Sequence, residues 1–175
     1  LGRRLHMTPA QIRKDLGYFG RFGKQGRGYD IPYLINELEQ ILGLNQEWPV
    51  ALVGVGRLGR AILGYPGFNP DGFHLVAAFD VNPQVIGEEV GGLAVRALEE
   101  LHRVTNEEKI SIAIVAVPVS QTQEVVDQLV ACGVRAILNY APIAPHVREG
   151  IKIRNIDPVL SLQSMTYYIN DSAEG

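Results

Sequence analysis

The sequence predicts an α/β fold, with a doubly wound parallel sheet over most of the chain and a smaller basic unit before it. From Val50 onward, apolar segments of strand length alternate with segments of helical pattern, as in repeated βαβ units. The segment at residues 111–117 is almost continuously apolar, which is typical of a parallel strand covered on both faces. A polar link with helix breakers, residues 43–49, separates the two parts.

Positive charge is concentrated at the start of the chain. The 175 residues carry a net charge of −3, and 46% of them are hydrophobic. Residues 1–29 hold seven Arg or Lys and one acid, a balance of 7 − 1 = +6, so residues 30–175 carry −9. This asymmetry favours binding to a phosphate backbone, although a solvated charged face is the alternative. No apolar run reaches the roughly 18 residues that span a bilayer, and a single cysteine, Cys132, favours the cytoplasm.

A short helix is predicted over residues 9–19. Thr8 is a suitable N-cap and Pro9 fits the first helical position. At 100° per residue, Ile12, Leu16 and Phe19 form one apolar stripe. The opposite side and its flank carry groups that can reach DNA bases or phosphates, namely Gln11, Arg13, Lys14 and Tyr18.

A glycine-rich basic stretch follows, and it predicts a tight hairpin over residues 20–29. Lys24 and Arg27 would lie at its tip, where they can follow a DNA backbone or enter a minor groove. The next helix begins at Asp30-Ile31-Pro32 and keeps one apolar face through Leu42. This arrangement of recognition helix, wing and linker helix predicts a winged-helix unit.

The remaining elements are read from the alternation of apolar and polar segments. We expect strands at residues 50–55, 75–80, 111–117, 134–140 and 151–156, with a short one near 93–95. We expect helices at residues 57–64, 98–104, 121–132 and 158–169.

A Gly-x-Gly-x-x-Gly motif joins the first of these strands to its helix. Gly54 allows the tight turn, Gly56 allows the backbone to approach a pyrophosphate, and Gly59 allows close packing of helix on strand. Asp80 ends the next strand, where its carboxylate can accept the ribose hydroxyls and repel a 2′-phosphate. The context favours a Rossmann-type site for NAD(H) over NADP(H), although Arg57 and Arg60 could neutralise a phosphate. A tight turn without a ligand is the structural alternative.

Catalytic residues are not evident. The four histidines are scattered, and no His, Cys or Asp cluster has catalytic or metal-ligand spacing. Residues 50–157 are needed for the sheet, which leaves no room for a substrate domain. We therefore expect no enzyme and no metal, and a bound cofactor would act as a signal. A small NAD-dependent reductase and a CoA-binding module are the rival interpretations.

The last predicted helix is too apolar to stand alone, because Val159, Leu162, Met165 and Ile169 share one side. It packs either on its own sheet or on a second subunit.

Several of these motifs together resemble the Rex family of bacterial redox-sensing transcriptional repressors. They are Gln11-Ile12-Arg13-Lys14-Asp15-Leu16, Arg27-Gly28-Tyr29-Asp30, the glycine motif, Ala77-Ala78-Phe79-Asp80, Ile137-Leu138-Asn139-Tyr140-Ala141-Pro142 and Arg154-Asn155-Ile156-Asp157. The likeness covers essentially the whole chain. Three residues depart from the family's usual choice, namely Gly17, Arg57 and Tyr140. The opening residues look like the end of a helix, so we expect the winged-helix domain to be N-terminally incomplete.

The resemblance implies a repressor that binds a palindromic operator as a homodimer, senses the NADH/NAD+ ratio and is released by NADH. It implies three parts: a partial winged-helix domain at residues 1–45, an NAD(H)-binding domain at 50–157, and a dimer-exchange helix with its tail at 158–175. The nicotinamide slot would lie near residues 116–118 and 140–142, with Tyr65 as a moving part. The cofactor-binding residues would be Gly54, Gly56, Arg57, Leu58, Gly59, Asp80, Val81, Ala116, Val117, Pro118, Asn139, Tyr140 and Ala141.

Overall fold

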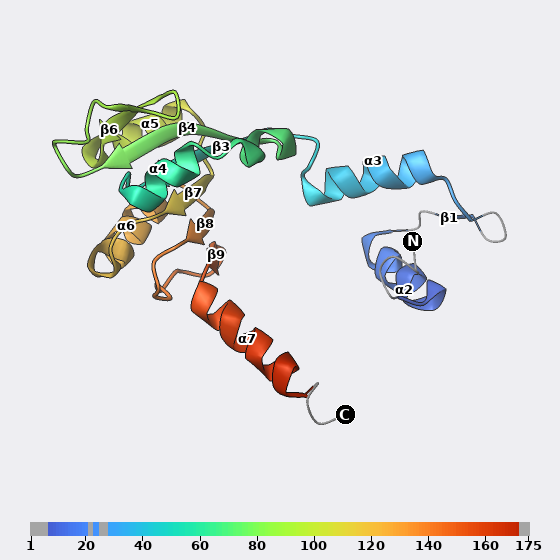
Figure 1. Cartoon of the computed structure of the whole chain (residues 1–175). Coiled ribbons are helices and arrows are strands. Elements are labelled where there is room, and N and C mark those ends of the chain that lie inside the picture. Colours follow the sequence, from blue (N-terminus) through green and yellow to red (C-terminus); the bar gives the residue numbers. More distant parts are fainter. Residues whose placement is uncertain (1–6, 21–22, 25–27, 172–175) are drawn as a thin grey trace. The chain divides into compact units, whose positions relative to one another are not determined.

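The structure is a computed structural model that describes residues 7–20, 23–24 and 28–171 (Figure 1). The chain divides into two compact units, Leu1–Glu47 and Trp48–Gly175.

The first unit holds two helices and a small hairpin. They are α2 (Pro9–Phe19), the strands β1 (Gly23–Lys24) and β2 (Gly28–Tyr29), and α3 (Ile31–Leu42). A capping box begins α2: Thr8 Oγ1 accepts from the Gln11 amide nitrogen at 3.2 Å, and Gln11 Oε1 accepts from the Thr8 nitrogen at 3.0 Å. The two strands pair antiparallel, Lys24 opposite Gly28. Both helices therefore lie where the sequence predicts them.

The second unit is built on a seven-stranded sheet with the order β5-β6-β4-β3-β7-β8-β9. Its strands are β3 (Trp48–Val53), β4 (Phe73–Asp80), β5 (Glu89–Val90), β6 (Leu93–Ala97), β7 (Ile112–Val115), β8 (Ala136–Asn139) and β9 (Lys152–Asn155). Every neighbouring pair is parallel except β5 with β6. The strand order reverses between β3 and β7, which is the point where doubly wound sheets bind ligands.

Helices cover both faces of this sheet, which explains why its central strands β3 and β7 are apolar throughout. On one face, α4 (Arg57–Leu63) packs over Leu52 and its neighbours. On the other face, α5 (Leu101–Glu107) and α6 (Val119–Ala131) pack over Val53 and its neighbours. Leu52 and Val53 are successive residues that point to opposite faces, and both are buried.

The structure also contains elements that the sequence does not predict. The 3₁₀ helices η1 (Pro66–Asp71) and η2 (Leu98–Glu100) and the edge strand β5 are too short to give a periodic pattern. The expected strands at 111–117 and 134–140 end early, at Val115 and Asn139, because the apolar residues after them already form turns. The connection from β8 to β9, residues 140–151, contains no helix.

The final helix, α7 (Pro158–Asp171), presents apolar side chains to solvent. The exposed fractions of Val159, Leu160, Leu162, Met165 and Ile169 lie between 58% and 68%. Over the ranges that the structure describes, no helix is long and apolar enough to cross a bilayer.

Candidate functional site

The turn after β3 is shaped by two glycines at which a side chain would overlap the backbone. Gly54 has a φ of +96°, and a Cβ there would stand 2.5 Å from the Ala116 carbonyl oxygen on the neighbouring strand connection. A Cβ on Gly59 would stand 2.0 Å from the Gly54 carbonyl oxygen. These two residues therefore bring the turn, β7 and α4 into close contact.

Gly56 differs from these two glycines. It is the N-cap of α4, with ordinary extended angles, and a Cβ there would meet no protein atom within 4 Å. Packing within the protein therefore gives no reason for a glycine at this position. The backbone N–H groups of the first turn of α4 have no intrahelical acceptor, so this surface fits a pyrophosphate that approaches the backbone closely.

Asp80, at the carboxyl end of β4, faces this turn. Its carboxylate accepts a hydrogen bond from the Val55 nitrogen at 2.7 Å and another from the Asn82 nitrogen at 2.8 Å. Each carboxylate oxygen has a second lone pair. Asp80 is thus held in place by the backbone while it can still accept hydroxyl groups of a ligand.

A pocket of about 270 Å³ lies at the carboxyl ends of β3, β4 and β7. Several predicted cofactor residues line it: Gly54, Gly56, Asp80, Val81, Ala116, Val117 and Pro118. The pocket also has walls that the sequence analysis missed, namely Val53, Val55, Asn82, Val85, Leu98, Gln121 and Val125. Gln121 lies in the first turn of α6, directly after a predicted strand and turn. This position at the start of a helix is the feature of the sequence that could have indicated a pocket residue.

The other predicted cofactor residues lie outside that lining. Arg57 and Leu58 are exposed on the first turn of α4, and Gly59 is buried against the turn. Asn139 and Ala141 are buried at the end of β8, with Tyr140 half-buried between them. The Tyr140 nitrogen donates to the Val115 carbonyl oxygen at 2.9 Å, so the 140–143 turn begins one strand away from the 116–118 turn of the pocket.

The two arginines of the glycine motif have different partners. Arg60 forms an ion pair with Glu88, in the connection between β4 and β5. Arg57 is exposed, and it forms no ion pair with an acid among the residues that the structure describes. Arg57 is therefore the better candidate to meet a ligand phosphate.

The first unit presents the predicted DNA-contacting side chains of α2 to solvent. Arg13, Lys14 and Tyr18 are exposed, and the exposed fraction of Tyr18 is 79%. The oxygen of the Gln11 amide is engaged by the capping box, which leaves its NH2 group as the free donor. Lys24 lies in β1, and Arg27 lies outside the described residues.

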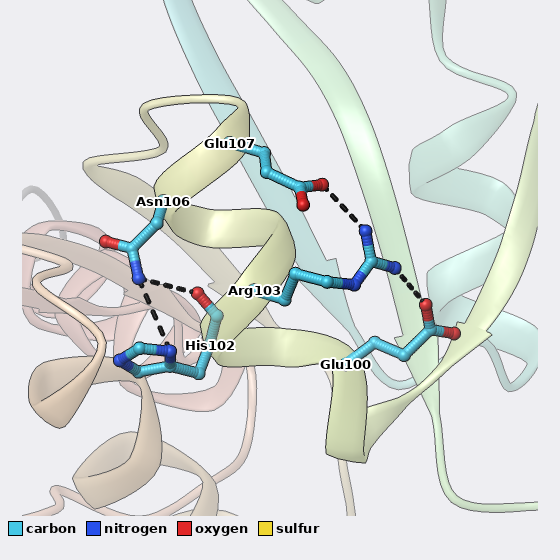
Figure 2. A network of polar contacts seen from close by, with 5 residues as sticks. All are labelled: Glu100, His102, Arg103, Asn106 and Glu107. Carbon is cyan, nitrogen blue, oxygen red and sulfur yellow. Dashed lines mark hydrogen bonds and ion pairs between the residues drawn. The ribbon is translucent and has the colours of Figure 1, made fainter.

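A polar network on η2 and α5 lies apart from the pocket lining (Figure 2). Arg103 pairs with Glu107 and Glu100, and its hydrogen bonds to these carboxylates raise the pKa of the guanidinium. Asn106 Nδ2 donates to the His102 carbonyl oxygen at 2.8 Å. Within the described ranges, no three His, Cys, Asp or Glu side chains gather closely enough to hold a metal ion.

A second, larger hollow of about 600 Å³ lies on the same sheet face as α4, which contributes no residue to its lining. The lining includes the apolar side chains of Ile114 and Leu138, and Tyr65 and Phe68 of η1 stand at its side. The connection from β8 to β9 places Tyr140 against this face but contains no helix that would cover it.

Comparison with known proteins identifies relatives over nearly the whole chain. The redox-sensing transcriptional repressor Rex of Chloroflexus aggregans is 54% identical over 169 residues, which are 97% of this chain and 80% of that protein. The Rex of Syntrophobacter fumaroxidans is 40% identical, over 97% of this chain and 81% of that protein. The sequence profile of a family described as CoA binding domain matches residues 45–143.

Solved structures of a Rex-family repressor also match nearly the whole chain. The Rex-family repressor RSP in complex with NAD+ and operator DNA has a TM-score of 0.89 and 35% identity, over 98% of this chain and 79% of that one. RSP in complex with NADH has a TM-score of 0.83 and 32% identity, over 98% of this chain and 80% of that one.

Proposed function

The chain belongs to the Rex family of redox-sensing transcriptional repressors, with a CoA-binding-type domain at residues 45–143, and from this premise we propose how it senses NADH and binds DNA. Its close relatives are named repressors and not enzymes. NAD+ and NADH are the cofactors, since the RSP structures contain one or the other.

The observation that carries the proposal is the pocket at Asp80. The adenosine ribose would place its hydroxyl groups on the Asp80 carboxylate, whose orientation is fixed by the Val55 and Asn82 N–H groups. The pyrophosphate would lie on the turn at Gly56, with Arg57 beside it. A phosphate on the ribose, as in NADPH or CoA, would meet the charge of Asp80, so NADH is preferred.

Discrimination between the two redox forms has to come from the nicotinamide end, because the rest of the molecule is identical in both. The nicotinamide supplies a ring that is neutral in NADH and positively charged in NAD+. The apolar side chains of Ala116, Val117 and Ala141 would accept the neutral ring and resist the charged one. Pro118 and Tyr140 complete this proposed slot, and Asn139 orients the turn that carries Tyr140. Leu58 and Gly59 belong to the first turn of α4, where the pyrophosphate would lie.

DNA binding is assigned to a winged-helix domain over residues 1–45. The side chains of Arg13, Lys14 and Tyr18 would enter a groove from α2, with the Gln11 NH2 group. Lys24 and Arg27 would contact the backbone from the hairpin. Such a protein works where the operator DNA is, which favours the cytoplasm.

The exposed α7 supports a homodimer. Its apolar side chains and the hollow beside Ile114 and Leu138 are two apolar surfaces of one unit, and burying both against a second copy removes them from water. We assign residues 158–175 to exchange between subunits and residues 50–157 to the NAD(H) domain. A two-fold dimer implies a palindromic operator.

The signal would then be a shift between two dimer geometries. NADH binds more tightly to the geometry in which the two recognition helices no longer match both half-sites, while NAD+ permits the DNA-bound one. A gel-shift titration with a palindromic operator and a varied NADH/NAD+ ratio tests this. Release by NADH but not by NAD+ or NADPH is expected, and binding that ignores the ratio contradicts the proposal.

A further inference from the structure

Asn139, at the carboxyl end of β8, has a fully buried side chain whose two amide hydrogens are engaged within the protein. Its Oδ1 accepts from the Ala141 nitrogen at 3.0 Å. Its Nδ2 faces three oxygens: those of the Ala141 carbonyl at 3.1 Å, the Ile143 carbonyl at 2.8 Å and Asn155 Oδ1 at 2.9 Å. A side chain that is fully buried and has both amide hydrogens engaged cannot donate to a ligand, so we infer that Asn139 acts through what it positions.

One group of these bonds shapes the turn that follows β8. The bonds to Ala141 and Ile143 fold residues 140–143 back over the Asn139 side chain. The bond from the Tyr140 nitrogen to the Val115 oxygen sets the start of the same turn beside the pocket strand β7. The position of this turn is therefore determined by one buried amide.

The remaining bond leads to the other side, toward α7. Asn155 is the last residue of β9, and the next residue, Ile156, donates its N–H to the Asn139 carbonyl oxygen at 2.8 Å. Asp157 then begins α7, because its Oδ1 accepts from the Val159 nitrogen at 2.8 Å. Only two residues separate the Asn139–Asn155 contact from the helix.

We propose that Asn139 and Asn155 form a positioning pair that couples the 140–143 turn to the root of α7, so that the nicotinamide state reaches α7 through one side-chain hydrogen bond. The proposal rests on the assignment of the nicotinamide to the 140–143 turn. It adds a specific transmitting contact, and neither residue touches the cofactor.

The useful variant is Asn155→Leu. Asn155 is exposed, and when its oxygen is removed the two hydrogens of the Asn139 amide still have the Ala141 and Ile143 carbonyls, so no buried group loses its last partner. Asn139→Ala would instead remove the partner of two backbone groups of the turn, the Ala141 N–H and the Ile143 carbonyl, and loss of folding would then hide the effect. Asn155→Asp keeps the acceptor. Asn106→Leu on α5 removes another exposed amide that donates to a backbone carbonyl, and it is the matched control (Figure 2).

The measurements are the affinities for ADP-ribose, NADH and NAD+ by titration calorimetry, together with thermal unfolding. Asn155→Leu should lower the ratio of NADH to NAD+ affinity about fivefold, the effect of one lost hydrogen bond, and should leave ADP-ribose affinity within about twofold. Asn155→Asp and Asn106→Leu should keep the parent ratio. A merely structural role would lower the unfolding temperature and leave the ratio unchanged.

Each other outcome counts against the coupling. The coupling is overturned if Asn155→Leu keeps the parent ratio of NADH to NAD+ affinity. It is also overturned if Asn155→Asp or Asn106→Leu lowers this ratio as strongly as Asn155→Leu does. If the parent protein fails to bind ADP-ribose, the nucleotide site itself is wrong, and the coupling falls with it. The two failures are thus distinguished by the ligand that lacks a nicotinamide.

Discussion

Replacing Gly56 or Gly59 by alanine separates the role of ligand binding from that of packing within one motif. The Cβ of Gly56→Ala would meet no protein atom within 4 Å, whereas that of Gly59→Ala would stand 2.0 Å from the Gly54 oxygen. The first change therefore acts on a bound pyrophosphate, and the second acts on the fold.

The stability changes follow from these geometries. At Gly56, φ is −72° and ψ is −161°, which alanine can adopt. Alanine there gains about 0.4–1 kcal/mol from a less flexible unfolded chain, and this is offset by its poorer N-cap preference. At Gly59 the overlap requires α4 to move by more than an ångström, at a cost of about 1–3 kcal/mol or more. For a protein of this length, 1 kcal/mol corresponds to about 2–4 °C in unfolding temperature.

Thermal unfolding and NADH titration by fluorescence measure the two effects together. Gly56→Ala should unfold within about 2 °C of the parent and should bind NADH at least tenfold more weakly, about 1.4 kcal/mol. Gly59→Ala should lose several degrees. Parent-like NADH binding by Gly56→Ala would refute the reasoning, because the methyl group would then stand where we place the pyrophosphate.

Three further predictions concern the nucleotide, the DNA and the dimer. Asp80→Ala should weaken the binding of NADH and relax the rejection of NADPH and CoA in competition titrations. It should also lower the unfolding temperature, since the Val55 N–H loses its acceptor. If the parent protein bound CoA as tightly as NADH, the rival interpretation as a CoA-binding module would be favoured. Lys14→Ala should cost about 1–3 kcal/mol of operator affinity and relax sequence preference. Lys24→Ala should lower the affinity for all DNA sequences alike and reduce the slope of log affinity against log salt by about one unit. Equal, sequence-independent losses of affinity in both variants would contradict the base-reading role of Lys14. Deleting residues 158–175 should abolish the stable dimer, as measured by sedimentation, and the difference between NADH and NAD+ affinity. Nucleotide binding at the glycine motif should partly survive. A truncated protein that remains a dimer and still distinguishes NADH from NAD+ would show that another surface carries the coupling.

Local signals explain how much of the fold is predictable from the sequence. The strand before Gly54 and the helix after it follow from an apolar run and a breaker, both of which lie within a few neighbouring residues. The short 3₁₀ helix at Pro66–Asp71 gives no such signal, because about two turns of 3₁₀ helix are too short to show a periodic pattern. The walls of the pocket were missed for a different reason: Val85, Leu98 and Val125 meet only after the strands have been ordered.

The same limit applies to individual side chains of the site. The charge of Arg57 and Arg60 alone does not separate them, since the sequence shows only that either could neutralise a phosphate. The folded chain brings Glu88 to Arg60, which makes Arg60 the less available of the two for a ligand.

Asn139 presents the opposite case. The resemblance predicts a direct contact between Asn139 and the cofactor, whereas in the structure this side chain is buried and both of its amide hydrogens are engaged within the protein. A motif reports that a residue type is required at a position. Whether that requirement comes from the ligand or from the loop that meets the ligand depends on the number of free hydrogen-bonding groups, which only the structure supplies. For this reason the experiment on the transmitted signal is directed at Asn155, where the bond can be removed while the buried amide keeps its other partners.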